Sequence, residues 1–285
     1  MKRALLLFVL AGCESALDQR LSLVEEPRVL AVTSEPAEGK PGDTITLSAL
    51  VASADGSLTA PPAWALCTAP KPPTEDNAVA DGCLGSTQVV ALGTAPTATT
   101  QIPTDACQLF GPDVPGSGFR PRDPDPTGGY YQPVRADAGE AGLAFGFARI
   151  TCKLGSAPAD VAHDYQTMYV ANKNPTLAPI TVDHVAADTD VTLTAAWDPP
   201  EQYLYYDPSS QTLITRRESM RVSWFATAGS LPVDATAVGE DDPATSVSTT
   251  WHTPAQAGPA WVWLVLRDSR GGIATRSAAI TVDGP

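Results

Sequence analysis

The sequence predicts an all-β protein built as two tandem β-sandwich domains behind a short export signal. Apolar and polar residues alternate in many short runs, as in residues 44–51, where Ile45 and Leu47 would share one buried face. Amphipathic spacing with the 3.6-residue period of a helix is weak throughout. We therefore expect many strands and little helix.

The start of the chain has the layout of a secretion signal. Lys2 and Arg3 are positive, residues 4–10 are apolar, and Ala11 and Gly12 are small. The apolar run is far shorter than the roughly 20 residues that span a bilayer as a helix, and no later run reaches that length. We expect residues 1–12 to be a signal peptide and no other segment to cross a membrane.

The residues around the expected cleavage point carry a family resemblance. Residues 10–13 read Leu-Ala-Gly-Cys, which resembles the lipobox of bacterial lipoproteins. The resemblance implies cleavage before Cys13, a diacylglycerol thioether on Cys13 and acylation of the new amino terminus. Several acyl chains give stable anchoring, whereas one gives reversible binding. Residues 13–26 would then be a lipidated tether. An ordinary secretion signal followed by a chance cysteine is the alternative.

Length and charge limit the classes of protein to which this chain can belong. The 285-residue chain without its signal is longer than one ordinary domain and suits two. The net charge of −14 of the full chain repels nucleic acid and anionic headgroups. We expect the membrane as a partner through the lipid anchor, a protein or polysaccharide as a further partner, and no nucleic acid.

Strand patterns divide the remaining chain into domains of residues 27–173 and 174–285. Residues 172–175, with the sequence Asn-Lys-Asn-Pro, read as a linker, after which a strand, turn, strand rhythm restarts at 180–182 and 191–197. Trp64 is predicted to lie in the core of the first domain. Strands of that domain are predicted at residues 28–33, 44–51, 63–67, 143–152 and 165–171.

The cysteines after Cys13 are four, an even number in a chain bound for an oxidising compartment. We predict the disulfides Cys67–Cys83 and Cys107–Cys152, because each would close an excursion rich in Pro, Gly and Asp. The second excursion, residues 107–138, is predicted to lack regular sheet. Strand parity places Cys67 on the face opposite Trp64. A zinc site is disfavoured because the chain has no CxxC pair.

The end of the chain carries the most specific fold signal. Trp224, on an expected strand 221–225, would be a buried core residue. The pattern that follows resembles the last strands of bacterial Ig-like and PKD-like repeats, which implies Ig-like β-sandwich domains and a closing hairpin with glycines at positive φ. The residues that carry this resemblance are Trp251, Pro254, a Gly258-Pro259 turn, the apolar strand 262–266, Asp268, Gly271-Gly272 and residues 273–282.

No catalytic set is recognisable. His163, His184 and His252 lie far apart and none belongs to an HxH or HExxH pattern. No GxSxG elbow is present, because Gly116-Ser117-Gly118 lies in a proline-rich stretch. We expect no enzyme and no catalytic residue, and a hydrolase is the least favoured of the function classes.

Two acidic groups are candidate calcium ligands, since calcium takes six to eight oxygen ligands from flexible loops. Prolines interrupt the first group, and Lys173 lies beside the second, so a solvated acidic surface is favoured and no metal or other cofactor is expected. The two groups are Asp113, Asp123 and Asp125, and Asp183, Asp188 and Asp190.

Aromatic residues give a second functional reading. On residues 261–266 both faces are apolar, so Trp261 and Trp263 would stand outside if the aliphatic residues fill the core. Exposed tryptophans bind sugars or proteins by stacking and burial. Alternatively, a neighbouring strand or the first domain covers this face. Tyr203, Tyr205 and Tyr206 form a cluster with the same ambiguity.

The sequence thus predicts a membrane-anchored extracytoplasmic lipoprotein with a non-enzymatic binding or structural role. We expect it in the bacterial cell envelope, facing the periplasm or the cell surface, with the outer membrane as the expected membrane. The alternative function is a carbohydrate-binding accessory module that uses exposed Trp261 and Trp263.

Overall fold

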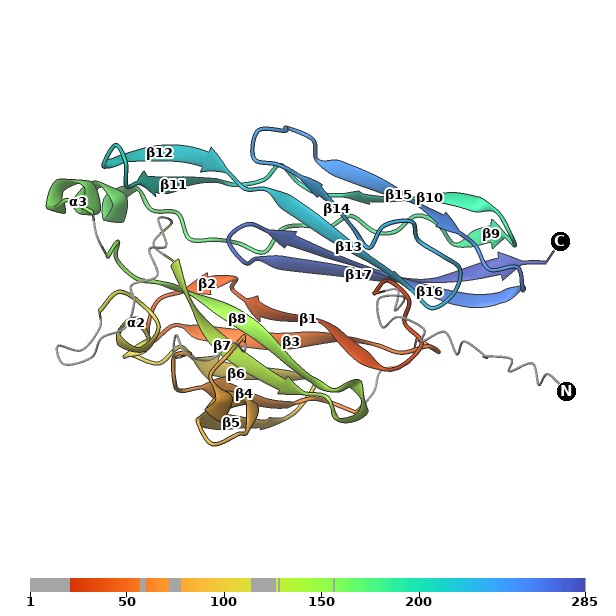
Figure 1. The fold of residues 1–285 in the computed structure, drawn as a ribbon, viewed down its shortest axis with the longest axis horizontal. Coiled ribbons are helices and arrows are strands. Elements are labelled where there is room, and N and C mark those ends of the chain that lie inside the picture. Colours follow the sequence, from red (N-terminus) through yellow and green to blue (C-terminus); the bar gives the residue numbers. More distant parts are fainter. Residues whose placement is uncertain are drawn as a thin grey trace, which may run out of the picture.

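A computed structural model of the chain describes residues 21–56, 60–71, 78–113, 127, 129–155 and 157–284. The predicted signal peptide and Cys13 lie outside the described residues, as do Asp123 and Asp125. The all-β prediction is confirmed, because strands dominate from Arg28 to Asp283 (Figure 1). Among the described residues, no helix has the length and apolar character needed to cross a membrane.

The first half of the molecule is a sandwich of two sheets. One sheet has the order β1-β3-β6 and the other the order β2-β8-β7-β4-β5. Between them lies a core in which Ile45 and Leu47 meet Trp64, Val134 and Ile150. The strands are β1 (Arg28–Glu35), β2 (Glu38–Gly39), β3 (Thr44–Ala52), β4 (Ala63–Cys67), β5 (Val89–Thr94), β6 (Thr97–Gln101), β7 (Gly129–Asp137) and β8 (Leu143–Thr151).

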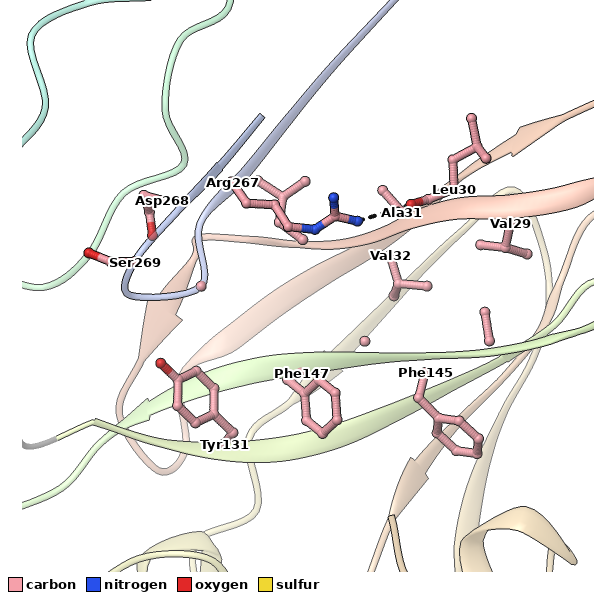
Figure 2. A pocket seen from close by; sticks show the side chains of 14 residues that line it. Val29, Leu30, Ala31, Val32, Tyr131, Phe145, Phe147, Arg267, Asp268 and Ser269 are labelled. Atoms are coloured by element: carbon pink, nitrogen blue, oxygen red, sulfur yellow. Dashed lines mark hydrogen bonds between the residues drawn. The ribbon is translucent and has the colours of Figure 1, made fainter. Parts of the chain in front are cut away.

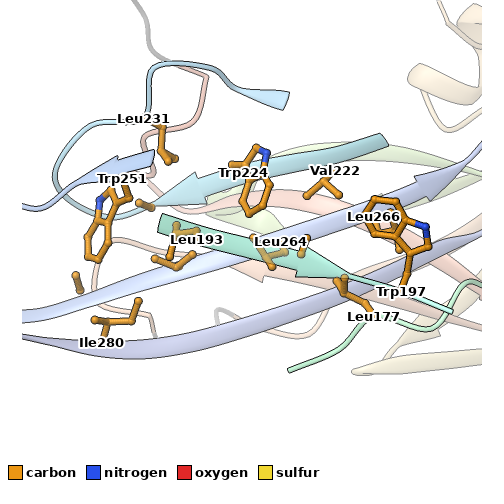
Figure 3. Packing of buried hydrophobic residues seen from close by; sticks show 14 of the residues in the cluster. Leu177, Leu193, Trp197, Val222, Trp224, Leu231, Trp251, Leu264, Leu266 and Ile280 are labelled. Carbon is orange, nitrogen blue, oxygen red and sulfur yellow. The ribbon is translucent and has the colours of Figure 1, made fainter. Parts of the chain in front are cut away.

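The second half has its own core between two further sheets. A five-stranded sheet, β14-β13-β16-β17-β9, faces the pair β10-β15, and β11-β12 forms a separate hairpin. Trp224, Trp251, Leu193 and Leu264 fill the core (Figure 3). The strands are β9 (His184–Ala186), β10 (Asp190–Ala196), β11 (Gln202–Asp207), β12 (Thr212–Arg217), β13 (Met220–Ala226), β14 (Ala235–Val238), β15 (Ser246–His252), β16 (Gly258–Asp268) and β17 (Ile273–Asp283).

Alternation of side chains explains these cores. Val222 and Trp224 on β13 lie opposite Leu266 and Leu264 on β16, so all four project to one face of the sheet. Both predicted core tryptophans are confirmed: Trp64 is 2% exposed and Trp224 is fully buried. On β8 the small residues face inward, and Phe147 points outward and is 45% exposed.

Helix occurs where the sequence predicted a strand. Residues 159–168 form α3 (Ala159–Met168), so the predicted strand 165–171 is wrong. Val161 and Tyr165 lie one turn apart and pack against the β11-β12 hairpin, which is how a short amphipathic helix is stabilised. The other helical elements are α1 (Asp81–Leu84), α2 (Ala106–Leu109) and the 3-10 turn η2 (Gly139–Ala141).

The excursion 107–138, predicted to lack regular sheet, contains strand β7, so that prediction is wrong for residues 129–137. β7 lies between β8 and β4, with Val134 and Ala136 buried on its inner face. Pro133, which lacks a donor, lies one residue beyond the stretch paired with β4. The missing N–H of Pro133 therefore costs no hydrogen bond with β4.

The closing hairpin is partly as predicted. Gly271 has φ +100° between β16 and β17, so the expected positive-φ glycine is confirmed. The predicted Gly258-Pro259 turn is wrong, because both residues pair with β17 and begin β16. The turn lies just before them, and β16 is correspondingly longer than residues 262–266.

The two halves lie alongside each other (Figure 1). Leu30 and Ala31 of the first half pack against Trp263 and Val265 of the second. The described part of the predicted tether belongs to this interface. Val24 is fully buried and its N–H bonds Ala226 O at 2.9 Å, so residues 22–24 are part of the folded body rather than a free tether.

Candidate functional site

The tryptophan pair lies on the outer face of its sheet, as predicted, but it is not exposed as a sugar platform. Trp263 is 2% exposed because the first half of the molecule covers it. Trp261 is half-buried above Gly56, where an added Cβ would lie 1.9 Å from the indole ring. The two rings stack with centroids 6.2 Å apart. The predicted exposure of Trp263 is therefore wrong, and the alternative that the first domain covers this face holds for Trp263, whereas Trp261 is partly accessible.

The tyrosine cluster is also engaged within the fold. Tyr206 is buried beside Tyr165, and the Arg216 guanidinium lies 3.8 Å from the centroid of the Tyr205 ring. Arg270 lies 5.0 Å from the Tyr203 ring centroid. These contacts join β11 to its neighbours, which gives the aromatic rings a packing role.

The four cysteines that the structure describes divide into one disulfide and one pair of thiols. Cys107 and Cys152 are joined, as predicted, with Cα atoms 5.8 Å apart. Cys67 and Cys83 are free, so the second predicted disulfide is not formed in the structure. Both are fully buried in a small cluster on the face opposite Trp64. Burial raises the pKa of Cys67, which disfavours the thiolate that disulfide formation requires.

The acidic candidates are held by neighbouring cations and amides. Asp188 and Asp190 bind the exposed His252 imidazole at 3.2 and 2.8 Å and raise the pKa of His252. Asp183 accepts from the backbone N–H of His184, and Asp113 pairs with Lys153 at 2.7 Å. Across the described residues, no group of three or more His, Cys, Asp or Glu side chains could hold a metal ion.

A buried polar network that the sequence did not reveal lies at the junction of the halves. Its first centre is Glu38, whose carboxylate pairs with Arg149 at 3.1 Å and accepts a hydrogen bond from Thr151 at 2.8 Å. Tyr169 also donates to Glu38, and burial raises the pKa of Tyr169, which keeps this donor protonated. Both Arg149 and Glu38 are almost inaccessible to solvent.

The second centre of the network is Arg270, which is 1% exposed. Its guanidinium bonds Glu218 at 2.8 Å and Glu201 at 3.0 Å. Burial, with Asp268 nearby, raises the pKa of Glu218 to about 7 against the opposing effect of Arg270. Burial also raises the pKa of Asp268, although backbone N–H groups of Gly272 and Arg270 oppose the shift.

Asn172 links the two centres. Its backbone N–H donates to Glu38 at 2.8 Å, and its side-chain Nδ2 lies 3.4 Å from both carboxylate oxygens of Asp268. Nearby, Asn174 donates to Ser34 O at 2.8 Å and accepts from the Ile273 N–H at 2.8 Å. The predicted linker therefore takes part in fixing the halves to each other.

Beside this network is a cavity of about 590 Å³. It lies between β1 and β8 of the first half and the β16-β17 hairpin of the second (Figure 2). Most of its lining residues are apolar, with Val29, Val32 and Ile273 among them. The Arg267 side chain enters from the second half and donates to Leu30 O at 3.0 Å.

Comparison with known proteins gives distant structural likenesses. No family model matches the chain, and no curated protein matches it. Salmonella alpha-2-macroglobulin is 12% identical with a TM-score of 0.26, over 92% of this chain and 15% of that chain. E. coli alpha-2-macroglobulin is 9% identical with a TM-score of 0.27, over 90% of this chain and 17% of that chain.

A third likeness is to the Yersinia pseudotuberculosis adhesin InvE, which is 13% identical with a TM-score of 0.23. The match covers 89% of this chain and 58% of the adhesin chain. This chain thus spans less than a fifth of the two macroglobulin chains and less than two thirds of the adhesin.

Proposed function

We propose that this chain is a lipid-anchored protein of the bacterial cell envelope with a non-enzymatic binding or structural role. The observation that carries the role is the junction centred on Asn172, which joins the two sandwiches into one body. The buried carboxylates Glu38, Glu218 and Asp268 are all hydrogen-bonded within the chain. They act as structural groups that hold a shape, and a fixed shape suits a protein that binds or supports a partner.

Two features support the location. Cys13 ends the lipobox-like sequence, and the Cys107–Cys152 disulfide is stable in the oxidising conditions outside the cytoplasm. We propose that lipid on Cys13 holds the body at a membrane, with its acidic surface repelled from anionic headgroups.

Metabolic labelling with radioactive palmitate tests the anchor. The wild-type chain should be labelled, and Cys13→Ser should lose the label and accumulate as uncleaved precursor. Cys83→Ser is the matched control, because it removes a buried thiol and leaves the lipobox intact. Equal labelling of the wild type and Cys13→Ser would overturn the proposed anchor.

Spin-label distances test the rigid body. Cysteines placed at the exposed positions Thr97 and Thr250, one in each half, report the relative position of the sandwiches. In the full-length Cys13→Ser chain, double electron-electron resonance should give one narrow distance distribution. Replacing Asn172 with Ala should broaden it. A broad distribution before that replacement would contradict a rigid body.

A further inference from the structure

The cavity between the halves exists because the sequence places small residues where the strands meet. Ala144 and Gly146 line it from β8, and a Cβ added at Gly146 would lie 2.5 Å from Val32 Cγ1. β8 therefore approaches β1 closely at Gly146, and Ala144 leaves space beside this contact. The cavity volume lies within the roughly 300–1,000 Å³ of typical small-molecule sites.

The charge at this cavity is unusual for so acidic a chain. Arg267 lines an otherwise largely apolar space, and its guanidinium donates a hydrogen bond to a backbone carbonyl, Leu30 O. It forms no ion pair with any residue that the structure describes. Burial and the like charge of Arg221, directly opposite on β13, both lower the pKa of Arg267. An anion bound in the cavity would offset both the cost of burying the Arg267 charge and its repulsion from Arg221.

The acidic side chain among the lining residues, Asp268, forms no ion pair with Arg267 in the described part of the chain. Asp268 also lines the cavity, but its Oδ1 accepts hydrogen bonds of 2.8 Å from the N–H groups of Arg270 and Gly272. Asn172 approaches both oxygens of the same carboxylate. Asp268 is thus directed into the hairpin turn and the junction.

We propose that the cavity binds an anionic amphiphile, with its aliphatic body against Val29, Val32 and Ile273 and its carboxylate bound by Arg267. The apolar walls favour the body, and the guanidinium provides a charged donor for the head group. This inference rests on the proposed binding role and assigns a ligand class to it.

Isothermal titration calorimetry with decanoate and decanol tests the proposal. The full-length Cys13→Ser chain is used because it carries no lipid on residue 13. Decanoate should bind about tenfold more tightly than decanol, since the ligands share a chain and differ in head-group charge. Equal affinities, or no binding of either ligand, would overturn the proposal.

Substitutions in the same chain locate the site. Arg267→Met should abolish the preference for decanoate, and Arg267→Lys should keep a preference because it keeps the charge. Ala144→Leu should fill the cavity and reduce binding of both ligands. Arg276→Met, at an exposed arginine of β17, is the control and should behave as the parent. Retention of the full preference by Arg267→Met would overturn the assignment of Arg267.

Thermal unfolding of each variant establishes that it is folded before titration. The lipid anchor is tested separately by palmitate labelling of the wild type. Labelling without decanoate binding would refute the cavity proposal and leave the anchor intact. Decanoate binding without labelling would refute the anchor and support the cavity.

Discussion

The backbone N–H of Asn172 donates a 2.8 Å hydrogen bond to the buried carboxylate of Glu38. Asn172 belongs to the segment between the halves, and its side chain reaches Asp268 of the second half. A single residue thus connects a carboxylate of each half. The polar contacts fix orientation here, while Trp263 and its neighbours supply the buried apolar area.

Asn172→Ala should destabilise the protein by about 1–3 kcal/mol, because it removes a donor from the buried Asp268 carboxylate. Urea unfolding of the full chain measures this loss. Gln101→Ala, at an exposed position of β6, is the control and should change stability little. Equal effects of the two substitutions would argue against a stabilising role for the Asn172 side chain.

Trp263→Ala should cost about 3–5 kcal/mol, because it empties a fully packed site between the halves. Trp261→Ala should cost less, since Trp261 is only half-buried. Denaturant unfolding of both variants gives the comparison. A larger loss from Trp261→Ala would contradict the packing described for this face.

The raised pKa of Glu218 predicts that the stability of the protein depends on pH. Its folded-state pKa of about 7 lies above the ordinary 4.5. The stabilisation that this raised pKa gives the folded state is therefore fully present below about pH 4.5. It is lost as the pH rises from about 4.5 to about 7, and the stability does not change further through this group at higher pH. The decline is on the order of 3 kcal/mol.

Glu218→Gln should remove this decline. The free energy of unfolding of the wild type should fall more than that of Glu218→Gln between pH 5 and pH 8, as measured by urea unfolding at both values. Glu26→Gln, at an exposed position, should keep the wild-type slope. Parallel slopes for the wild type and Glu218→Gln would rule out the predicted titration.

The Cys107–Cys152 disulfide closes a loop with a sequence separation of 45 residues. On the chain-entropy model its loss should cost about 4 kcal/mol. Guanidinium unfolding of the double variant Cys107→Ala/Cys152→Ala should show this loss, and reduction of the wild type should reproduce it. A reductant should not affect the double variant. Unchanged stability on reduction would show that the bond does not constrain the unfolded chain.

Local alternation was sufficient to predict the cores. Trp64 and Trp224 lie on strands whose apolar residues recur every second position, and both are buried as expected. Alternation failed at Tyr165, whose burial follows the helical pairing with Val161. It also failed in β7, where Pro133 and neighbouring glycines concealed a strand.

The junction could not be predicted from local pattern. Arg149 and Glu38 come together from distant parts of the chain, and neither sequence neighbourhood indicates a buried ion pair. The outer-face position of Trp261 and Trp263 could be read from parity, but their cover comes from the other half. One sequence signal for the junction was available: two closely spaced charges, Asp268 and Arg270, followed by a glycine pair. Such charges at a tight hairpin can form hydrogen bonds with its backbone.

The parallel bridge between Leu23 and Ala226 determines which way a tethered molecule would stand. It fixes the start of the described chain at the end of the body where β17 also finishes, while α3 and α2 lie at the opposite end (Figure 1). For a chain held through Cys13, the end at which the described residues begin would lie next to the membrane. The helices α3 and α2 would then lie at the end of the body that faces away from the membrane.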